Sequence, residues 1–306
     1  MCGCNYQQPL KTCNVMSNTS IDQIKILFDD ILKHQLAQDT WHWLSASVKD
    51  SNATAETFTR IPRKTGKSLV KLSAPDEQSL RELNNATMHD WTVDRLARVW
   101  LLMNLEEKDK TKYIRQTETL FAGAEVSELV ALYTALPYLS FPEHWMAQCA
   151  EGIRSNISDV LQAIMCNNPY PAKWLDERAW NQMVLKAFFT DKPIHLIIGL
   201  DERANRELAN ALSYYAHERW AASRTVNPQL WRCVGKFIDE KLFPDIERIA
   251  ASENSLEREA AALACNDSSY QPAKELLNQF PGSKQSITAG QLTWGTLAEK
   301  ISTNKN

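Results

Sequence analysis

The spacing of apolar residues constrains the fold of this chain more than any other feature. Apolar residues recur at every third or fourth position through most of the sequence after Ser20, which is the spacing of one face of an α-helix. The one run compatible with a β-strand, residues 195–200, is short. The sequence therefore predicts an all-α fold of stacked antiparallel helical hairpins, as a HEAT-like α-solenoid or an irregular helical array. Predicted helices outside the centre of the chain include residues 109–121, 126–136, 142–153, 155–164, 239–251 and 255–264.

The length and the apolar content together predict one helical domain. The chain has 306 residues, of which 44% are hydrophobic, enough to bury a core that needs no disulfide or metal. We expect a single all-helical domain over residues 18–302, preceded by a disordered tail over residues 1–17. That tail contains Cys2, Cys4 and Cys13 but no His, whereas a closed zinc site needs four ligands. We predict no metal site and no cofactor.

Charge and hydropathy exclude several classes of function. The formal net charge of −3 gives no overall attraction to nucleic acid, so we expect no nucleic-acid partner. No apolar run reaches the roughly 18–20 residues that a membrane span requires. The first residues lack the apolar stretch of a secretory signal. These features predict a cytoplasmic protein.

A basic segment at residues 59–72 (TRIPRKTGKSLVKL) breaks the helical pattern. It carries Arg63 and Lys67 among five basic residues, with no acid. The run Gly66-Lys67-Ser68 lacks the earlier Gly that a phosphate-binding P-loop needs, because position 61 is Ile. The segment is therefore either a loop that meets an anion, with Arg63 and Lys67 as candidates, or a solvated linker.

Residues 176–236 combine charge and aromatic rings more densely than the rest of the chain. In the first predicted helix of this stretch, Trp180 lies on the apolar face, Asn181 at its border and Lys186 on the opposite side. Pro193 ends that helix. Asn227 and Pro228 have the residue types of an N-cap and a first helical position. Arg203 and Arg232 are further candidates for binding an anion.

Arg219 falls within the apolar stripe of the second predicted helix in this stretch, beside Leu208, Leu212 and Tyr215. A buried guanidinium costs several kcal/mol unless a carboxylate or a ligand anion pairs with it. Two interpretations follow. Arg219 forms a structural ion pair, or it clamps an anion in an apolar groove. The possible ion-pair partners are Asp176, Glu177 and Asp201, and the groove would be lined by Trp180, Tyr215, Trp220 and Trp231.

His217 and Glu218 are the weak catalytic candidates of the same helix. They adjoin Arg219 in sequence, but three consecutive side chains of a regular helix point in different directions. They are therefore not expected to converge on one substrate atom.

These same residues carry a resemblance to the EboA family of helical proteins, which extends from about residue 20 to 280. The chain departs from the family at its Cys-rich beginning and at Ser223, where Gly is expected. The matching segments are residues 180–186 (WNQMVLK), 199–205 (GLDERAN), 215–222 (YAHERWAA) and 230–235 (LWRCVG), with the third the most specific.

The resemblance implies a bacterial cytoplasmic protein of a specialised-metabolite pathway. Its partners would be enzymes encoded nearby, namely a prenyltransferase, a sugar-phosphate cyclase and a metal-dependent hydrolase. The family brings no reaction and no catalytic residues. The sequence therefore favours an accessory protein that binds a pathway enzyme or an anionic intermediate. The alternative is an enzyme acting on a phosphorylated or prenylated small molecule, with Arg219 and Arg203 binding the anion and His217 or Glu218 as acid or base.

Overall fold

The computed structural model describes residues 18–49, 54–83, 88, 90–106 and 108–303. The predicted tail with Cys2, Cys4 and Cys13 lies outside these residues. The all-α class is confirmed: the described residues form helices, and their only β-type pairing is an isolated bridge between Leu69 and Thr92. A HEAT-like repeat stays a prediction. None of the described helices is long and apolar enough to cross a bilayer.

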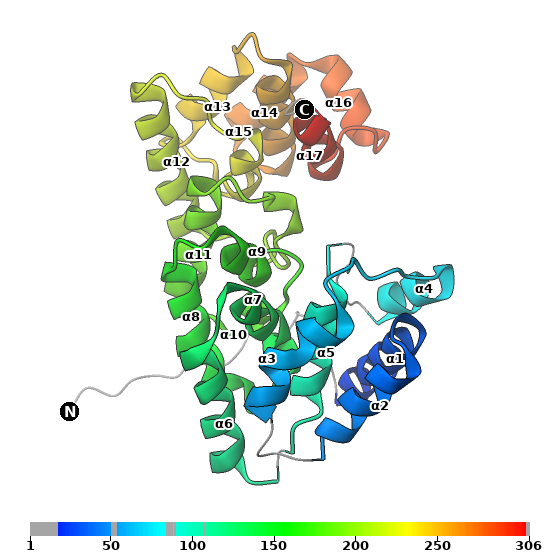
Figure 1. The fold of residues 1–306 in the computed structure, drawn as a ribbon. Helices are drawn as coiled ribbons and strands as arrows, with labels where there is room; N and C mark the ends of the chain where they lie inside the picture. The colour runs from blue at the N-terminus through cyan, green and yellow to red at the C-terminus, as the bar shows by residue number, and fades with distance from the viewer. Residues whose placement is uncertain (1–17, 50–53, 84–87, 89, 107, 304–306) are drawn as a thin grey trace, which may run out of the picture. The chain divides into compact units, whose positions relative to one another are not determined.

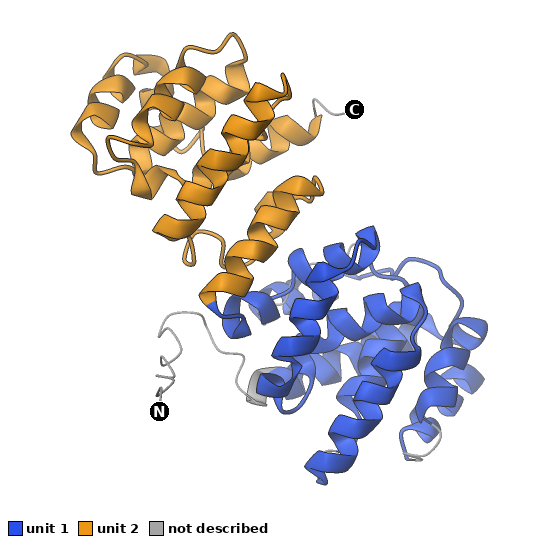
Figure 2. Cartoon of the chain, turned by 90° about the vertical axis from the view of Figure 1, so that its left-hand side faces the viewer, with its two compact units in different colours: residues 1–176 blue, residues 177–306 orange. Residues whose placement is uncertain are grey.

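The chain divides into two compact units, Met1–Asp176 and Glu177–Asn306 (Figure 2), where the sequence predicts a single domain over residues 18–302. The boundary coincides with the start of residues 176–236, which we call the central stretch. The α-helices of unit 1 are α1 (Asn18–Gln35), α2 (Gln38–Ser47), α3 (Thr54–Thr65), α4 (Ala74–Glu82), α5 (Val93–Met103), α6 (Lys110–Gly123), α7 (Val126–Ala135), α8 (Met146–Arg154), α9 (Ser158–Met165) and α10 (Tyr170–Trp174). Its 3-10 helices are η1 (Leu136–Tyr138) and η2 (Pro142–Trp145).

Helix α5 forms the centre of unit 1 and packs against α1, α3 and α7 (Figure 1). It is buried nearly all round because Leu96, Val99, Trp100 and Leu101 are directed at different neighbours. Helix α7 packs on α5 with one side and on α9 with another. The order α5, α7, α9 leaves part of the surface of α7 between its two neighbours, and this is where the candidate site lies.

The basic segment is more helical than the sequence predicts. Helix α3 continues to Thr65 and holds Pro62 in its last turns. A proline has no amide hydrogen, so the carbonyl of Phe58, four residues earlier, loses its helical donor. The Nε of Arg98 on α5 donates to that carbonyl instead, at 3.0 Å. The prediction of a loop from residue 59 is therefore wrong up to Thr65, because a tertiary hydrogen bond compensates for the proline.

Unit 2 is arranged around α14. Its α-helices are α11 (Glu177–Phe189), α12 (Arg206–Ala221), α13 (Phe243–Ala250), α14 (Ser255–Asp267), α15 (Gln271–Asn278), α16 (Pro281–Thr288) and α17 (Trp294–Thr303). Its 3-10 helices are η3 (Ile194–Leu196), η4 (Pro228–Cys233) and η5 (Gly235–Phe237).

Small residues allow several elements to approach α14 closely. The helix contacts α13, α15, α16, α17, η4 and η5, and Ala260, Ala261 and Ala264 are buried. A Cβ at Gly235 would lie only 3.0 Å from the Cα of Ala264. Glycine is therefore required where η5 meets α14.

The predicted N-cap at Asn227 and first helical position at Pro228 are confirmed, but the helix that they start is of a different kind from the one predicted. The Asn227 side chain accepts a hydrogen bond from the amide of Gln229 at 3.0 Å, and Pro228 follows as the first helical residue. The helix they start is the 3-10 helix η4 rather than an α-helix. Residues 195 and 196, the first two of the run considered as a strand, belong to η3.

Candidate functional site

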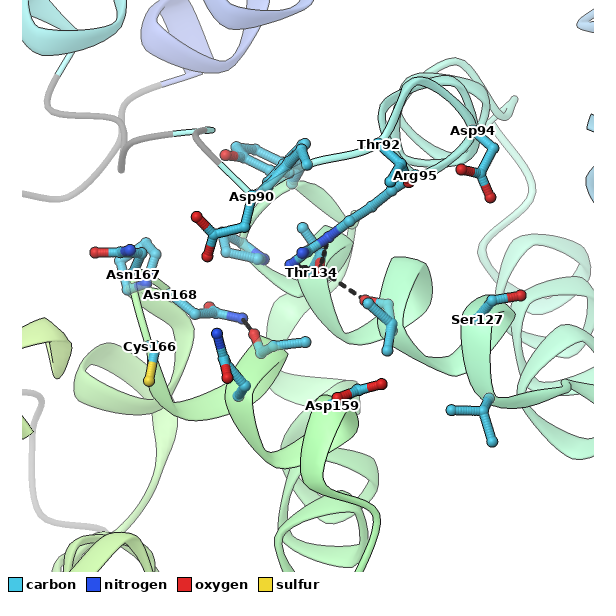
Figure 3. Close-up of a pocket in the computed structure, with 18 residues that line it drawn as sticks. Asp90, Thr92, Asp94, Arg95, Ser127, Thr134, Asp159, Cys166, Asn167 and Asn168 are labelled. Atoms are coloured by element: carbon cyan, nitrogen blue, oxygen red, sulfur yellow. Dashed lines mark hydrogen bonds between the residues drawn. The ribbon is translucent and has the colours of Figure 1, made fainter. Parts of the chain in front are cut away.

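A cavity of about 450 Å³ lies along α7 in unit 1, and we refer to it as the α7 groove (Figure 3). Ser127, Val130 and Thr134 of α7 form its floor, at the three- and four-residue spacing of one helix face, and Tyr138 of η1 continues the lining. Residues 90–95 at the start of α5 form one wall, and residues 159–169 of α9 and the following turn form the other. Of these lining residues, Ser127 is exposed and Thr134 is buried.

A second hollow lies at the surface of unit 2, between α15 and α16. All six residues that line it are exposed, and its one charged residue, Lys284, is hydrogen-bonded to Asn278 at 2.7 Å. It offers no buried surface, so its one charge is exposed to water. We therefore take the α7 groove as the candidate site.

The guanidinium of Arg95 is the main charged group inside the α7 groove. Its Nε and Nη2 donate to the hydroxyl oxygen of Thr134 at 2.9 and 2.6 Å, as Figure 3 shows. Its Cζ lies 4.9 Å from the ring centroid of Trp91. No carboxylate of the described residues lies within salt-bridge distance. A neutral hydroxyl and an aromatic face therefore hold this cation in place without neutralising it.

Burial lowers the pKa of Arg95 to about 10. The charges of Asp90, Tyr138 and Asp94 act in the opposite direction but do not compensate. A lowered pKa in a base means that the protein disfavours the charged form relative to water. At neutral pH Arg95 is nevertheless a cation, partly stripped of water and facing a cavity. Such a group binds carboxylates and phosphates well, because an incoming anion supplies the missing counter-charge.

The charge of Arg98, one turn further along α5, is compensated by carboxylates, in contrast to that of Arg95. Only 2% of it is exposed, and its Nη1 donates to Asp94 Oδ2 at 2.9 Å. Its Nη2 lies 3.6 Å from a carboxylate oxygen of Glu128. With the bond to the Phe58 carbonyl, its planar donor groups meet two carboxylates and one backbone oxygen. Arg98 connects α5 to α3 and α7, whereas Arg95 faces the α7 groove.

Hydrogen bonds within unit 1 fix both walls of the α7 groove. The side-chain amide of Asn168 donates to the carbonyls of Tyr133 and Ala163, at 3.0 and 2.9 Å, and joins the turn after α9 to α7. On the other wall, the amide of Val93 donates to the carbonyl of Ser68 at 2.9 Å. The amide of Val70 donates to the carbonyl of Trp91 at 2.8 Å. These bonds anchor the residues that precede α5.

The basic candidates Arg63 and Lys67 are both exposed. Arg63 lies in α3, and Lys67 follows Gly66, whose φ of 74° ends the helix. Because residues 68–70 pair with residues 91–93, this segment runs beside the wall of the α7 groove. Of the two interpretations from the sequence, a meeting with an anion remains a prediction, and this position is compatible with it.

Arg219 does not lie in the core. Its side chain is partly exposed, and its Nε donates to the carbonyl of Thr225 at 3.0 Å. The expected ion pair with Asp201 is wrong, because that carboxylate binds Arg232. The apolar stripe of α12 reaches the surface in its last turn, where a long side chain can extend its charge to solvent. Arg219 thus stabilises the loop after α12.

The end of α12 explains the departure at Ser223. The amides of Ser223 and Arg224 donate to the carbonyls of Trp220 and Arg219, at 2.9 and 2.8 Å, which is the pattern of a Schellman motif. Ser223 has a φ of 54°, in the left-handed region that favours glycine. The family resemblance leads us to expect Gly at this position, and Gly would adopt this φ without strain.

Arg232 forms a structural ion pair. Its Nε and Nη2 donate to the two carboxylate oxygens of Asp201 at 2.6 and 2.5 Å. Burial opposes its charge, but the hydrogen bonds and the charge of Asp201 outweigh that effect and raise its pKa. The Nζ of Lys236 also donates to the backbone carbonyl of Asp201, at 3.0 Å. These contacts link η4 to the turn before α12.

The other candidates near the start of unit 2 belong to packing contacts. Arg203 lies over the ring of Trp180, with its Cζ 4.7 Å from the centroid. Asn181 and Asn205 exchange side-chain hydrogen bonds of 3.1 and 2.8 Å. Lys186 is partly exposed on α11. Trp180 is fully buried. An anion-binding role for these residues stays a prediction.

The remaining aromatic candidates do not meet at Arg219. Trp220 stacks on the fully buried Trp231, with ring centroids 5.8 Å apart, and Arg248 lies over Trp220 at 4.2 Å. Tyr215 is buried against Phe189, and burial raises its pKa. The structure thus separates the candidates of the central stretch into several contacts rather than one groove.

His217 acquires a partner that the sequence does not reveal. Its Nε2 lies 2.5 Å from Oδ1 of Asp245 on α13, whose other oxygen accepts a hydrogen bond from the Ser213 hydroxyl at 2.6 Å. Asp245 is 5% exposed, whereas the His217 side chain is 55% exposed. A buried carboxylate therefore orients an accessible imidazole. Glu218 is exposed and, as expected, points elsewhere from the helix.

Sequence reasoning misses the α7 groove because its parts are far apart in the chain. Arg95 and Thr134 are separated by 39 positions, and neither residue is unusual in its own helix. The one local signal is a charged residue in the first turn of a helix that is otherwise buried on most sides. Without the position of α9, that signal does not distinguish a solvated arginine from a groove.

Comparison with known protein families assigns the chain to one of them. A family model described as metabolite traffic protein EboA matches residues 24–235. The chain belongs to the EboA family. The matched range contains every residue of the α7 groove in this EboA protein, while Asp245 lies outside it. No curated protein and no solved structure gives a significant match to the chain.

Proposed function

We propose that this EboA protein is an accessory protein that binds an anionic small molecule in the α7 groove and passes it on unchanged. The observation that supports this proposal is Arg95, a cation with a lowered pKa and a neutral hydroxyl as its hydrogen-bond partner, inside a cavity of about 450 Å³. That volume is within the range of small-molecule sites. The family description as a metabolite traffic protein fits binding without conversion.

The proposed ligand end is a carboxylate or a phosphate. Arg95 has its Cζ 4.9 Å from the Trp91 ring centroid and uses Nε and Nη2 for Thr134. Its remaining donors can serve an anion, because a guanidinium carries five N–H groups. The specialised-metabolite pathway, the cytoplasmic location and the neighbouring pathway enzymes implied by the family resemblance are part of the same proposal. The enzyme that receives the molecule would bind close to the groove.

Binding of simple anions tests the proposal directly. We would titrate the protein with inorganic phosphate, glycerol 3-phosphate and hexanoate by calorimetry, and repeat the titrations with Arg95→Met. At least one probe should bind saturably, and Arg95→Met should weaken it tenfold or more, because a charge-assisted hydrogen bond is lost. Arg219→Met, a partly exposed arginine in unit 2, is the matched control and should bind as the unsubstituted protein does.

Two results would contradict the proposal. One is the absence of saturable binding for all three probes. The other is binding that Arg95→Met leaves unchanged. If Arg219→Met rather than Arg95→Met abolished binding, the anion site would lie in the central stretch, as the sequence suggests.

A second candidate function is supported by His217 and Asp245. A buried carboxylate that accepts from one ring nitrogen of a histidine leaves the other nitrogen able to take up a proton. In this alternative the protein is an enzyme acting on a phosphorylated or prenylated small molecule, with His217 as acid or base. Arg219 and Arg203, the anion binders suggested by the sequence, contact the Thr225 carbonyl and the Trp180 ring instead. The ring of Trp220, 5.6 Å from that of His217, would provide an apolar surface beside it.

The enzyme alternative is tested by release of phosphate or pyrophosphate from sugar phosphates and prenyl diphosphates. Activity that His217→Gln reduces at least a hundredfold, without a change in melting temperature, would support it. Activity equal in the unsubstituted protein and in His217→Gln would exclude His217 as the acid or base.

A further inference from the structure

Two consecutive residues of α5 supply opposite charges to the α7 groove. Side chains of adjacent helical residues diverge by about 100° around the helix axis, and Asp94 and Arg95 leave α5 on different sides in Figure 3. Both residues line the groove. A ligand that reaches Arg95 is therefore not automatically in contact with Asp94, so the two groups act as separate points of recognition.

One oxygen of Asp94 is buried without a partner. Asp94 is 4% exposed, and its Oδ2 accepts from Arg98 at 2.9 Å. Its Oδ1 has no hydrogen-bond partner among the described residues. Buried polar atoms are nearly always hydrogen-bonded, so an exception needs an explanation. An oxygen that lacks a donor, in a residue that lines a cavity, can receive that donor from a ligand.

Arg98, the partner of Asp94, and Arg95 contact α7 at different levels. Arg98 bridges Asp94 to Glu128, which lies in the first turn of α7. Arg95 reaches Thr134, six residues further along the same helix. At a rise of about 1.5 Å per residue, Glu128 and Thr134 lie roughly 9 Å apart along α7. Val130 lies between them on the floor of the groove.

We infer that the ligand of the α7 groove carries two unlike ends, an anionic group for Arg95 and a hydroxyl or ammonium donor for Asp94. This inference rests on the proposed function and specifies its ligand. The exposed carboxylates of Asp90 and Asp159, which also line the groove, favour a neutral or positive second end. A molecule with an anion at both ends is repelled at the Asp94 level.

Three probes of similar length separate these requirements. We would measure the affinities of 6-aminohexanoate, hexanoate and adipate, which share a carboxylate and differ at the far end. The ammonium compound should bind about tenfold or more tightly than hexanoate, because it adds a hydrogen bond to a charged partner. Adipate should bind more weakly than hexanoate. Arg95→Met should reduce the affinity for both 6-aminohexanoate and hexanoate.

Substitution of the carboxylates identifies the residue that selects the ammonium end. Asp94→Asn should reduce the affinity for 6-aminohexanoate to that of hexanoate. Asp159→Asn removes a charge from the exposed rim and should change the same affinity less than threefold. Because Asp94 also pairs with Arg98, binding by Asp94→Asn is compared only after circular dichroism shows a folded protein. The comparison of the three probes with the unsubstituted protein does not depend on that variant.

The outcomes distinguish the inference from the proposed function. Equal affinities for 6-aminohexanoate and hexanoate, both dependent on Arg95, overturn the inference and leave the proposed function intact. The inference also fails if none of these three probes binds while inorganic phosphate does so through Arg95. Failure of phosphate, glycerol 3-phosphate and hexanoate contradicts the proposed function, and the inference that rests on it fails with it.

Discussion

Replacing Arg95 by methionine should make the ligand-free protein more stable. Lowering the pKa of an arginine from its ordinary value to about 10 corresponds to about 3 kcal/mol of free energy that disfavours the charged form. The hydrogen bonds to Thr134 offset about 1 kcal/mol of this cost, and the contact with the Trp91 ring offsets about 1 kcal/mol more. A methionine keeps an apolar contact with Trp91. Thr134 stays hydrogen-bonded, because its hydroxyl donates to the carbonyl of Val130 at 2.6 Å.

The balance is a gain of about 1 kcal/mol in the free energy of unfolding, or about 2–4 °C in melting temperature for a unit of this size. Calorimetry and urea denaturation of the two proteins measure it. The cost of the charge applies at every pH below about 10, where the arginine is protonated in both the folded and the unfolded chain. The difference should therefore be the same at pH 6 and pH 9 and should shrink above pH 10.

Arg98→Met is the matched control on the same helix. It removes the partner of two buried carboxylates, Asp94 and Glu128, and should cost about 3–5 kcal/mol. Two arginine-to-methionine changes one turn apart should thus move the melting temperature in opposite directions. A fall of more than about 2 °C for Arg95→Met would refute the reasoning, because Arg95 would then be a net stabilising group and not one held in place for a ligand.

Three further substitutions test the contacts of unit 2 by thermal or urea unfolding. Ser223→Gly relieves a left-handed residue and should raise the free energy of unfolding by about 0.5–1 kcal/mol, whereas a loss would contradict the strain at this position. Gly235→Ala brings a methyl group to 3.0 Å from the backbone of Ala264 and should cost about 1–3 kcal/mol, and an unchanged stability would show that η5 can move away from α14. Asp201→Asn removes the charge that pairs with Arg232 and should cost about 1–2 kcal/mol, with a smaller cost in high salt. The same cost with and without salt would mean that hydrogen bonding alone matters there.

Much of the fold can be predicted from local patterns in the sequence. Apolar spacing indicates the helices, and the cap at Asn227 follows from residue types that have a local mechanism. The errors come from contacts that are distant in the chain. Pro62 interrupts the pattern, but Arg98 satisfies the carbonyl that the proline frees, and α3 continues. Periodicity also does not specify which helices pack together into the two compact units on either side of Asp176.

The candidate site is less predictable than the fold, for the same physical reason. A helical wheel shows which residues share a face but not where the helix ends relative to the surface. Arg219 lies on the apolar stripe of α12 and still reaches solvent, because it occupies the last turn. The helical wheel of α5 does not identify Arg95 as a site residue, yet Thr134 and the turn after α9 enclose it. What distinguishes Arg95 from the other arginines is the loss of water around its charge, and that loss depends on tertiary packing.

Unit 1 shows that this chain can neutralise a buried charge where structure alone requires it. Arg98 meets two carboxylates and a carbonyl on three different helices. On the same helix, Asp94 retains an oxygen without a donor and Arg95 retains a charge without a counter-ion, and both residues face one cavity. Each of these features lowers stability in the absence of a ligand. Stability alone does not explain why a guanidinium without a counter-ion and a carboxylate oxygen without a donor both lie at the wall of one groove. A molecule with complementary ends supplies that reason, because its binding satisfies both groups at once.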